Sequence, residues 1–297
     1  MDSKREAKQQ PLVSVVIPHF NDISNLRICY LRIMQQTWPA DRVELIIADN
    51  NSSCGLDAVR EAAPKAVVVP APVQGAGAAR NAGITASHGG VLALIDSDCV
   101  PEANWIAEGV TALERYDFVG GRVLTTALSP DRPNFIESYE KVFNFNFRRY
   151  IEKVGFTGTG NMFVRRDVFN RVGGFRLAVS EDMDWSFRAR AMGYRLGYAE
   201  SAIVSHPARR NWQELRRRWV RIQDEHYASA KERAHGRLLF GLKALLMPAS
   251  VPPHAMKVLM SPQLPGLLSK FGAIGVLTRL RFWRAYRMLY LLAADAF

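Results

Sequence analysis

Short apolar runs alternate with amphipathic stretches along the first hundred residues. The apolar runs lie at 13–17, 43–48, 66–69 and 91–95, and each has the length and composition of a buried strand. The amphipathic stretches lie at about 22–36, 56–63 and 76–86. Apolar residues recur there at helical spacing, as Leu26, Tyr30 and Ile33 do in the first. This alternation predicts an α/β fold, with a parallel sheet, right-handed crossovers and helices on its faces.

Polar residues follow three of these runs. Pro18-His19-Phe20-Asn21 follows the first, Asp49 ends the second, and Asp96-Ser97-Asp98 follows the fourth. Because ligands of open α/β sheets bind outside the carboxyl ends of the strands, these residues are expected to line one edge, where a nucleotide can lie. Asp96 and Asp98 are two apart, so in a continuing strand both would project to the same side. Paired carboxylates suit a hard divalent ion held jointly with a phosphate; a turn capped by aspartate is the alternative.

A glycine-rich segment, Gly75-Ala76-Gly77-Ala78-Ala79-Arg80, opens the third helical stretch. The third glycine of the dinucleotide pattern G-x-G-x-x-G is replaced by Arg80, which disfavours a nicotinamide-type fold. At the start of a helix, Arg80 is suited to contact a phosphate or a base, and a surface ion pair is the alternative.

The second hundred residues are less regular. A helix at 101–115 and a strand at 118–124 precede an aromatic-rich stretch at 134–151, which suits either core packing or a wall for a sugar or lipid. The segment that follows contains Gly155, Gly158 and Gly160. Glycines let the backbone approach a ligand closely, so this segment is a candidate binding loop, with a flexible connector as the alternative.

Three carboxylates cluster in Ser180-Glu181-Asp182-Met183-Asp184-Trp185, which opens a helix running to about Met192. Acidic residues complement the dipole at a helix start, but three in four positions exceed that need, so one of them is a candidate general base. A strand at 195–205 then ends at His206. A single histidine is most often structural; at a strand end, in a chain that also offers Asp-x-Asp, it is a candidate metal ligand.

The last third of the chain carries the whole net charge of +11. Residues 1–206 hold 23 basic and 23 acidic residues, whereas residues 207–297 hold 16 basic and 5 acidic ones. The neutral body argues against a nucleic-acid partner, and the basic tail suggests an anionic contact. Three cysteines without metal-ligand spacing favour a reducing compartment. The polar residues 1–10 show no secretory signal, so we expect a cytoplasmic location.

The C-terminal region combines this charge with interrupted apolar segments. Segments 238–247 and 264–277 are broken by Lys243 and Lys270, so they fall short of a membrane-spanning helix. Within 279–297, one helical stripe holds Phe282, Tyr286, Leu289 and Ala293, and Arg281, Arg284 and Arg287 lie off it. This pattern is typical of a basic helix on a membrane surface, which is expected to bind anionic but not neutral vesicles and to be released by salt. A helical subdomain packed on the core and a homodimer interface are the alternatives.

Seven segments resemble, in order, those of family 2 glycosyltransferases of the GT-A fold. They are VSVVIPHFN, ELIIADNNS, GAGAARNAG, ALIDSDCVPE, GTGNMFVRRDVFNRVGGF, SEDMDWSFRARAMGYR and AIVSHP, and they span residues 12–207. The resemblance implies a Rossmann-like, mostly parallel sheet. It also implies an inverting transfer of a sugar from a nucleotide diphosphate donor, a UDP-sugar by first choice, with Mn²⁺ or Mg²⁺. The implied acceptor is a hydroxyl of a glycan, lipid-linked in polysaccharide assembly, reached from the cytoplasmic face of a membrane.

The resemblance also implies roles for single residues. Asp182 would be the catalytic base, and Asp98 and His206 the metal ligands. Asp49 would contact the nucleotide base, Arg80 the nucleotide, and Asp96 the ribose or the metal shell. Pro18, Phe20, Asn21 and Ser97 would complete the nucleotide-sugar site. The acceptor and sugar pocket would be lined by Gly158, Thr159, Gly160, Asn161, Glu181 and Trp185.

The chain then divides into a polar tail (1–10), a catalytic domain (11–207) and a basic helical region (208–297). The catalytic domain would have a nucleotide-binding half, 11–100, and an acceptor half, 101–207. Processive members carry Q-x-x-R-W, whereas this chain has Leu215 in place of the glutamine, which argues against polymer synthesis. A sugar-phosphate nucleotidyltransferase would carry G-x-G-[TS]-R-L where this chain has Pro18-His19-Phe20-Asn21. A non-catalytic membrane adaptor is the remaining alternative.

Overall fold

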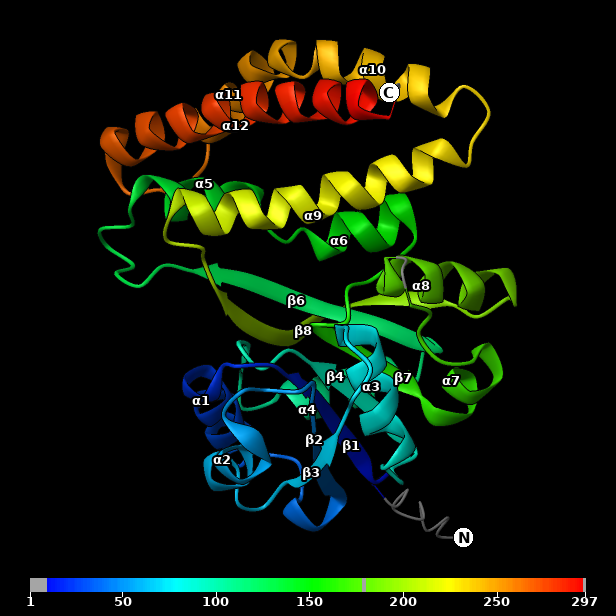
Figure 1. Cartoon of the computed structure of the whole chain (residues 1–297). Coiled ribbons are helices and arrows are strands. Elements are labelled where there is room, and N and C mark those ends of the chain that lie inside the picture. The colour runs from blue at the N-terminus through cyan, green and yellow to red at the C-terminus, as the bar shows by residue number, and fades with distance from the viewer. Residues whose placement is uncertain (1–9, 178–179, 296–297) are drawn as a thin grey trace, which may run out of the picture. The chain divides into compact units, whose positions relative to one another are not determined.

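The computed structural model describes residues 10–177 and 180–295 and contains an eight-stranded sheet in the order β3-β2-β1-β4-β7-β6-β8-β5 (Figure 1). Its first four strands are those that the apolar runs predict: β1 (Val13–His19), β2 (Val43–Asp49), β3 (Val67–Pro70) and β4 (Val91–Ile95). They run parallel, with β1 between β2 and β4. Pro18, which was expected to stop the first strand, lies inside β1. This is possible because β4 pairs with β1 only as far as Val16, so Pro18 has no ladder hydrogen bond to lose on that side.

The second half of the sheet is partly antiparallel. Its strands are β5 (Val100–Pro101), β6 (Phe118–Thr126), β7 (Asn161–Arg165) and β8 (Leu196–Pro207). The strand β7 pairs antiparallel with both β4 and β6, and β5 pairs antiparallel with β8. The expected helix at 101–115 begins only at Trp105, because Val100 and Pro101 are taken up by the short strand β5.

Helices cover the sheet: α1 (Ile23–Ile33), α2 (Gly55–Ala62), α3 (Ala76–Thr85), α4 (Trp105–Ala112), α7 (Arg166–Val172) and α8 (Glu181–Ala191). A short helix, α6 (Phe147–Arg149), runs into a π-helical turn at Tyr150–Val154. The side chain of Asp22 caps α1 by accepting the backbone N–H of Asn25 at 3.2 Å, which satisfies one of the donors left over at a helix start.

Both faces of the sheet are buried, as expected for a parallel sheet. Alternate residues of β1 and β4 point to opposite sides. Ile17 and Ile95 join a core with Trp105 beneath α1 and α4, and Val16 and Leu94 join a second core with Trp185 beneath α7 and α8. The strand ends are thereby held on a rigid support from both sides.

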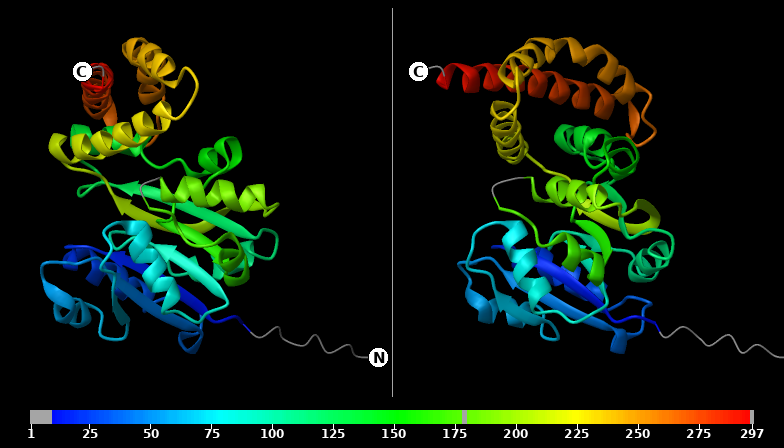
Figure 2. Two further views of the ribbon diagram at one scale, coloured as in Figure 1. Left: turned by 45° about the vertical axis from the view of Figure 1, so that its right-hand side comes forward. Right: turned by 90° about the vertical axis from the view of Figure 1, so that its right-hand side faces the viewer.

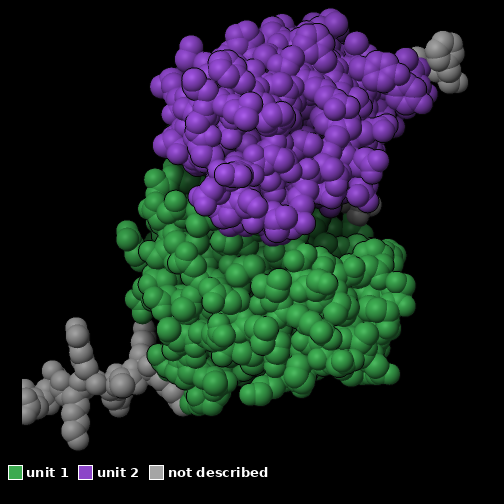
Figure 3. Space-filling model, turned by 90° about the vertical axis from the view of Figure 1, so that its left-hand side faces the viewer, with its two compact units in different colours: residues 1–124, 146–206 green, residues 125–145, 207–297 purple. Residues whose placement is uncertain are grey.

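The chain forms two compact units, coloured separately in Figure 3. Unit 1 comprises residues 1–124 and 146–206, and unit 2 comprises residues 125–145 and 207–297. The sequence placed the division near residue 207 alone. Residues 125–145 belong with the C-terminal region because their helix, α5 (Phe135–Phe143), packs against the last helix, where Tyr139 shares a core with Leu215 and Leu277.

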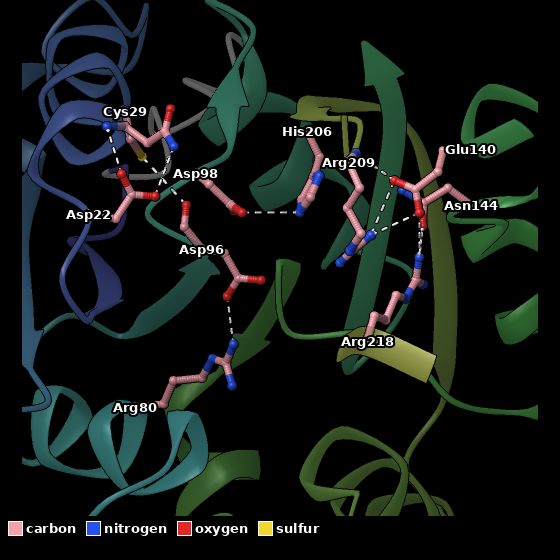
Figure 4. Close-up of polar contacts among 11 residues, drawn as sticks. Asp22, Cys29, Arg80, Asp96, Asp98, Glu140, Asn144, His206, Arg209 and Arg218 are labelled. Carbon is pink, nitrogen blue, oxygen red and sulfur yellow. Dashed lines mark hydrogen bonds and ion pairs between the residues drawn. The ribbon is translucent and has the colours of Figure 1, made fainter. Parts of the chain in front are cut away.

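Unit 2 is helical. Besides α5 it contains α9 (Trp212–Lys231), α10 (Gly236–Leu246), α11 (Val251–Leu259) and α12 (Gly266–Ala294), with a 3-10 turn at Pro248–Ser250. The two turned views in Figure 2 show α10 and α11 lying along α12, which contacts both. The buried Glu140 of α5 accepts hydrogen bonds from the guanidinium groups of Arg209, at 3.0 Å, and Arg218, at 3.3 Å (Figure 4). This network ties α5 to the chain that enters α9.

The apolar stripe predicted within 279–297 lies on the outside of unit 2. Phe282, Tyr286 and Leu289 are exposed, while the opposite face of α12 is buried and includes Arg284. These three side chains therefore take no part in the buried cores of unit 2. Among residues 10–177 and 180–295, no helix combines the length and the apolar character needed to cross a membrane.

Candidate active site

Asp98 and His206 come together at the edge of the sheet. The pairing of β5 with β8 sets Val100 opposite Ser205, so the residues just before Val100 and just after Ser205 are neighbours. The Nε2 atom of His206 lies 3.3 Å from Oδ2 of Asp98 (Figure 4). The predicted pairing of these two residues as metal ligands is thus sterically possible, and the antiparallel β5–β8 ladder is its structural cause.

Asp96 points to a different partner. The strand β4 ends at Ile95, and a turn follows in which the N–H of Cys99 donates to the carbonyl of Asp96 at 3.0 Å. Asp96 and Asp98 therefore do not continue the strand, and the expectation that both project to the same side of it is wrong. Oδ1 of Asp96 accepts a hydrogen bond from Nη2 of Arg80 at 2.6 Å. Gly160 lies against this carboxylate, since a Cβ at Gly160 would come within 2.8 Å of Oδ2 of Asp96; only glycine fits there without displacing it.

Arg80 is a buried link rather than a surface residue. It lies on α3 with 4 % of its surface exposed, and its Nη1 donates to Oε1 of Glu181 at 3.1 Å while Nη2 holds Asp96. Burial alone would lower the pKa of Arg80, but the charges of Asp96 and Glu181 outweigh it and raise that pKa. Arg80 therefore stays charged and connects the end of β4 to the start of α8.

Asp49 is held by the end of β1. In the β1–β2 register His19 lies opposite Asp49, and Nδ1 of His19 is 2.9 Å from Oδ1 of Asp49. Nε2 of His19 accepts the N–H of Asp22 at 3.2 Å, so the ring proton sits on Nδ1 and is donated to Asp49. Burial raises the pKa of Asp49, but hydrogen bonds from Ser52 and His19 outweigh it and lower that pKa below its ordinary value. The site thus presents an ionised, fixed carboxylate.

The sequence placed His19 at the nucleotide edge without a partner and gave Asn50 no role. The contact of His19 with Asp49 depends on the register of β1 and β2, which the structure supplies. Asn50 accepts the N–H of Gly75 at 2.8 Å and donates to the carbonyls of Ala71 and Val73, so it shapes the loop that enters α3. Asn21, with φ of +53°, accepts the N–H of Ser53 at 2.8 Å and joins the loops after β1 and β2. Phe20 beside it is exposed and Pro18 is partly buried.

The three carboxylates at the start of α8 differ in their partners. Glu181 is bound to Arg80. Asp184 pairs with Arg188 at 2.8 Å and with Arg176 at 3.5 Å. Within the part of the chain that the structure describes, Asp182 has no basic side chain at ion-pair distance. It accepts the N–H of Met183 at 2.8 Å and the hydroxyl of Ser180 at 3.2 Å.

The pKa of Asp182 is shifted in the direction that suits a general base. Burial raises it, the neighbouring charge of Glu181 raises it further, and the hydrogen bonds from Met183 and Ser180 and the charge of Arg80 reduce the rise without cancelling it. A carboxylate whose pKa lies closer to the working pH is a stronger base when ionised.

The predicted sugar pocket is only partly accessible. The side chain of Trp185 is fully buried, stacks on Phe169 and donates its Nε1 hydrogen to the carbonyl of Gly173, so it belongs to the core and has no surface to offer a sugar. Asn161 is also fully buried, where it accepts the Nε1 hydrogen of Trp105. The three residues before Asn161 also differ in exposure. Gly158 and Thr159 are buried, whereas Gly160, beside Asp96, is partly exposed.

The pair of Asp98 and His206 fits a divalent ion as part of its coordination. A carboxylate oxygen and an imidazole nitrogen are both accepted by Mn²⁺, and Mg²⁺ is commonly bound through one or two carboxylates together with substrate phosphates. Among the described residues no group of three or more ligating side chains occurs. Any ion here would therefore take its remaining ligands from the diphosphate of a donor and from water.

A mixed α/β sheet with carboxylates and a histidine at the ends of its strands is the arrangement expected of an enzyme that binds a nucleotide at this edge. The chain belongs to glycosyl transferase family 2, whose model matches residues 14–173. It is a glycosyltransferase.

Two named relatives are similar to it. Glycosyltransferase AglE of Haloferax volcanii is 35 % identical over 208 residues, which are 67 % of this chain and 68 % of that protein. The "Probable glycosyltransferase YdaM" of Bacillus subtilis strain 168 is 26 % identical over 238 residues, which are 73 % of this chain. The match spans only 56 % of the length of the second relative.

A solved structure shares the fold. The mannosyltransferase PcManGT from Pyrobaculum calidifontis, in complex with GDP-Man and Mn²⁺, superposes with a TM-score of 0.59 at 20 % sequence identity and covers 97 % of this chain and 87 % of its own. This likeness confirms the GT-A architecture that the sequence implied.

Proposed function

We propose that the protein transfers a sugar, with inversion, from a nucleoside diphosphate donor to a hydroxyl acceptor, and that Asp182 is the base. The observation that carries this proposal is the different use of the three carboxylates on α8. Glu181 and Asp184 are occupied by arginines, whereas Asp182 keeps a raised pKa and has no basic side chain at ion-pair distance among the described residues. A single in-line displacement requires one such group, on the face opposite the leaving diphosphate.

The donor would lie along the carboxyl ends of β1, β2 and β4. Asp49, held by His19 and Ser52, would accept hydrogen bonds from the nucleotide base. Asp96 and Gly160 would adjoin the ribose and diphosphate, since Gly160 leaves the backbone open beside the carboxylate. Asp98 and His206 would hold Mn²⁺ or Mg²⁺, which when bound neutralises charge that develops on the leaving diphosphate.

The sequence and the structural neighbour suggest different nucleotide bases for the donor. Sequence reasoning favoured a UDP-sugar, whereas the structural neighbour was solved with GDP-Man. Both are nucleoside diphosphate sugars, and Asp49 can accept from a donor group of either base. We propose a nucleoside diphosphate hexose and leave the choice of base to the binding experiment below.

The acceptor is proposed to be a lipid-linked glycan, met at the inner face of a membrane during polysaccharide assembly. The excess of 11 basic residues over acidic ones in 207–297, 16 against 5, supports this setting, because an anionic lipid surface attracts basic segments. A homodimer formed through the same region is the competing arrangement.

Two measurements test the proposed reaction. Thermal shift with UDP- and GDP-hexoses, each with Mn²⁺ or Mg²⁺, identifies the donor, because a ligand that binds the folded state raises the melting temperature. Transfer to a hydroxyl acceptor is then followed by NMR, and the anomeric configuration of the product is compared with that of the donor. Inversion is expected; retention of configuration would overturn the mechanism, and stabilisation by no nucleotide sugar would overturn the donor assignment.

A further inference from the structure

The outward face of α12 is apolar although this helix carries five basic residues. Phe271, Phe282 and Tyr286 are each more than half exposed, at 61, 57 and 68 %. Two of the basic residues turn the other way: Arg284 is buried with its guanidinium carbon 3.6 Å from the ring centroid of Trp219, and Arg287 donates to Asp224 at 2.6 Å. Rings therefore face outward, and the guanidinium groups of Arg284 and Arg287 face inward.

The neighbouring helix α10 also exposes apolar side chains. It buries Phe240 and Ala244 in a core with Tyr227 and Met288, yet five of its leucines remain 47–66 % exposed: Leu238, Leu239, Leu242, Leu245 and Leu246. A helix that is apolar on nearly all sides is normally covered by protein or lipid. Further exposed apolar side chains stand on α11 and at the start of α12: Met256, Leu259, Met260, Leu267 and Leu268.

The charge in this part of the chain is mainly positive. Residues 233–294 contain nine Lys and Arg residues and no Asp or Glu; Arg237 pairs with Asp295, while Lys243 and Lys257 are exposed. A second copy of the chain seated on this surface by a twofold axis would place like charges opposite each other. A phospholipid surface offers hydrocarbon to the leucines and rings and phosphate to the basic side chains, whose long stems reach the headgroups.

We infer that the exposed apolar face of α10, α11 and α12 inserts into the interfacial layer of a lipid membrane. Apolar burial, rather than attraction to anionic lipid, supplies most of the binding. This inference rests on the membrane setting of the proposed function, but it concerns the mode of contact. It differs from the salt-sensitive binding that the sequence pattern predicts, because the structure turns Arg284 and Arg287 away from the exposed face.

The test is flotation of the full-length protein with two kinds of vesicle. One is made of phosphatidylcholine alone, and the other also contains phosphatidylserine. We expect flotation with both, and most of it retained at high salt, because screening weakens charge attraction and not apolar burial. The triple variant Leu238→Glu/Leu242→Glu/Leu245→Glu is expected to lose flotation at least tenfold.

Two variants serve as controls. Ile28→Glu/Leu31→Glu places the same kind of change on exposed positions of α1 in unit 1 and is expected to float like the wild type. Arg216→Glu/Arg217→Glu removes exposed charge from α9 and is expected to reduce only the preference for anionic vesicles. Circular dichroism and gel filtration confirm that each variant folds.

Three results would overturn the inference. Binding that requires anionic lipid and vanishes in salt would mean electrostatic adhesion. Unchanged flotation of the leucine variant would place the contact elsewhere. A lipid-free dimer that the leucine variant dissociates, without any flotation of the wild type, would mean that a second copy covers the face. None of these depends on transferase activity, so failure here is distinct from failure of the proposed reaction.

A separate observation concerns Arg80. Its two terminal nitrogens bind Asp96 and Glu181 at 2.6 and 3.1 Å, and its Nε has no hydrogen-bond partner among the described residues although it is buried. Helix α3 also contacts the start of α8 directly, since a Cβ added at Gly77 would lie 3.3 Å from Cβ of Glu181. The end of β4 and the first turn of α8 are thus joined through one side chain.

The geometry points to Arg80 as a positioning residue that couples the donor side of the site, at Asp96, to the placement of Asp182. It acts through Glu181, the residue before Asp182, and this inference rests on the proposed base. Lysine keeps the charge but cannot bind two carboxylates with a planar fork. We therefore expect Arg80→Lys to lower kcat at least tenfold with a smaller change in donor KM.

The pH profile separates this role from a merely structural one. Arg80→Ala removes a positive charge near Asp182 and is expected to move the acidic inflection of kcat to higher pH, whereas Arg176→Ala, which removes a partner of Asp184, is expected to leave it in place. If Arg80→Ala does not fold, Arg80→Lys decides alone. A raised donor KM with unchanged kcat and an unmoved profile would make Arg80 only a donor contact. Failure of the base assignment itself would appear separately, as activity in Asp182→Asn.

Discussion

The two compact units use charge in opposite ways. In unit 1 the core is apolar, and the carboxylates and histidines gather at one edge of the sheet, where Asp49, Asp96 and Asp98 follow buried strands. In unit 1 the buried charges, Asp49 and Arg80, also belong to that edge, whereas in unit 2 Glu140 and Arg284 are buried among helices while leucines and aromatic rings are exposed. The difference shows that the polar groups of unit 1 are gathered at the candidate active site, whereas unit 2 exposes the apolar face that we propose inserts into a membrane.

The largest expected effect falls on the metal pair of unit 1. Asp98→Ala removes the carboxylate that lies 3.3 Å from His206, and we expect transfer to fall by roughly 10³-fold, since metal ions supply several kcal/mol of charge stabilisation in the transition state. Excess EDTA on the wild type is the parallel measurement. Full activity of Asp98→Ala, or of the wild type in EDTA, would show that transfer does not need a metal ion at this site.

A large effect on stability is expected in unit 2. Glu140→Ala leaves Arg209 and Arg218 without their buried partner, and breaking a buried pair typically costs about 3–5 kcal/mol. Because both arginines are partly exposed, at 23 and 17 % of their side chains, we expect about 3 kcal/mol or less, measured by chemical unfolding. Glu140→Gln, which keeps hydrogen-bond acceptance at one atom, is expected to lose less. Equal stability of both variants and the wild type would contradict the assigned role.

A smaller effect is expected in the pH dependence of unit 1. In the proposed mechanism Asp182 acts in its ionised form, so kcat is expected to fall as the pH drops through the pKa of that group. Burial and Glu181 raise this pKa, so the inflection should lie above the ordinary value of about 3.9. Glu181→Gln removes a neighbouring negative charge and should move the inflection to lower pH. An inflection that stays in place would show that Glu181 does not act on the base.

The smallest effect is expected at an exposed ion pair. Arg60 and Asp57 are 2.7 Å apart on α2 but both are highly exposed. Arg60→Ala is expected to change neither the free energy of unfolding nor kcat measurably, since exposed pairs contribute little. A clear loss in either measurement would mean that this ion pair on α2 contributes to folding or to catalysis.

The sequence predicted the parallel half of the sheet because each of its strands is a continuous apolar run, such as Val91–Ile95. The carboxylates at the strand ends, and the meeting of Asp98 with His206, followed from the same pattern and from the family resemblance. The partner of Asp49, His19, did not, because cross-strand register is not readable from one strand alone. The family resemblance placed Trp185 in the sugar pocket, but each residue of a helix is turned by about 100° from the one before, and Trp185 points into the core.

The second unit was less predictable for a physical reason. Helix α5 lies far in sequence from α12, and only tertiary packing between Tyr139 and Leu277 brings them into one core. The sequence also could not tell on which side of α12 the arginines lie, because periodicity fixes relative positions on a helix and not which face meets the protein.

Asp182 is proposed as the base of the glycosyl transfer, and the turnover of an asparagine variant is the sharpest test of that role. The kcat of Asp182→Asn is determined with saturating donor and acceptor, beside Asp184→Asn, which removes a carboxylate already paired with Arg188. We predict a loss of roughly 10²–10⁴-fold in kcat for Asp182→Asn, with donor affinity by thermal shift nearly unchanged. The loss for Asp184→Asn should be much smaller. Near-normal turnover of Asp182→Asn, together with a dead Asp184→Asn, would contradict the assignment.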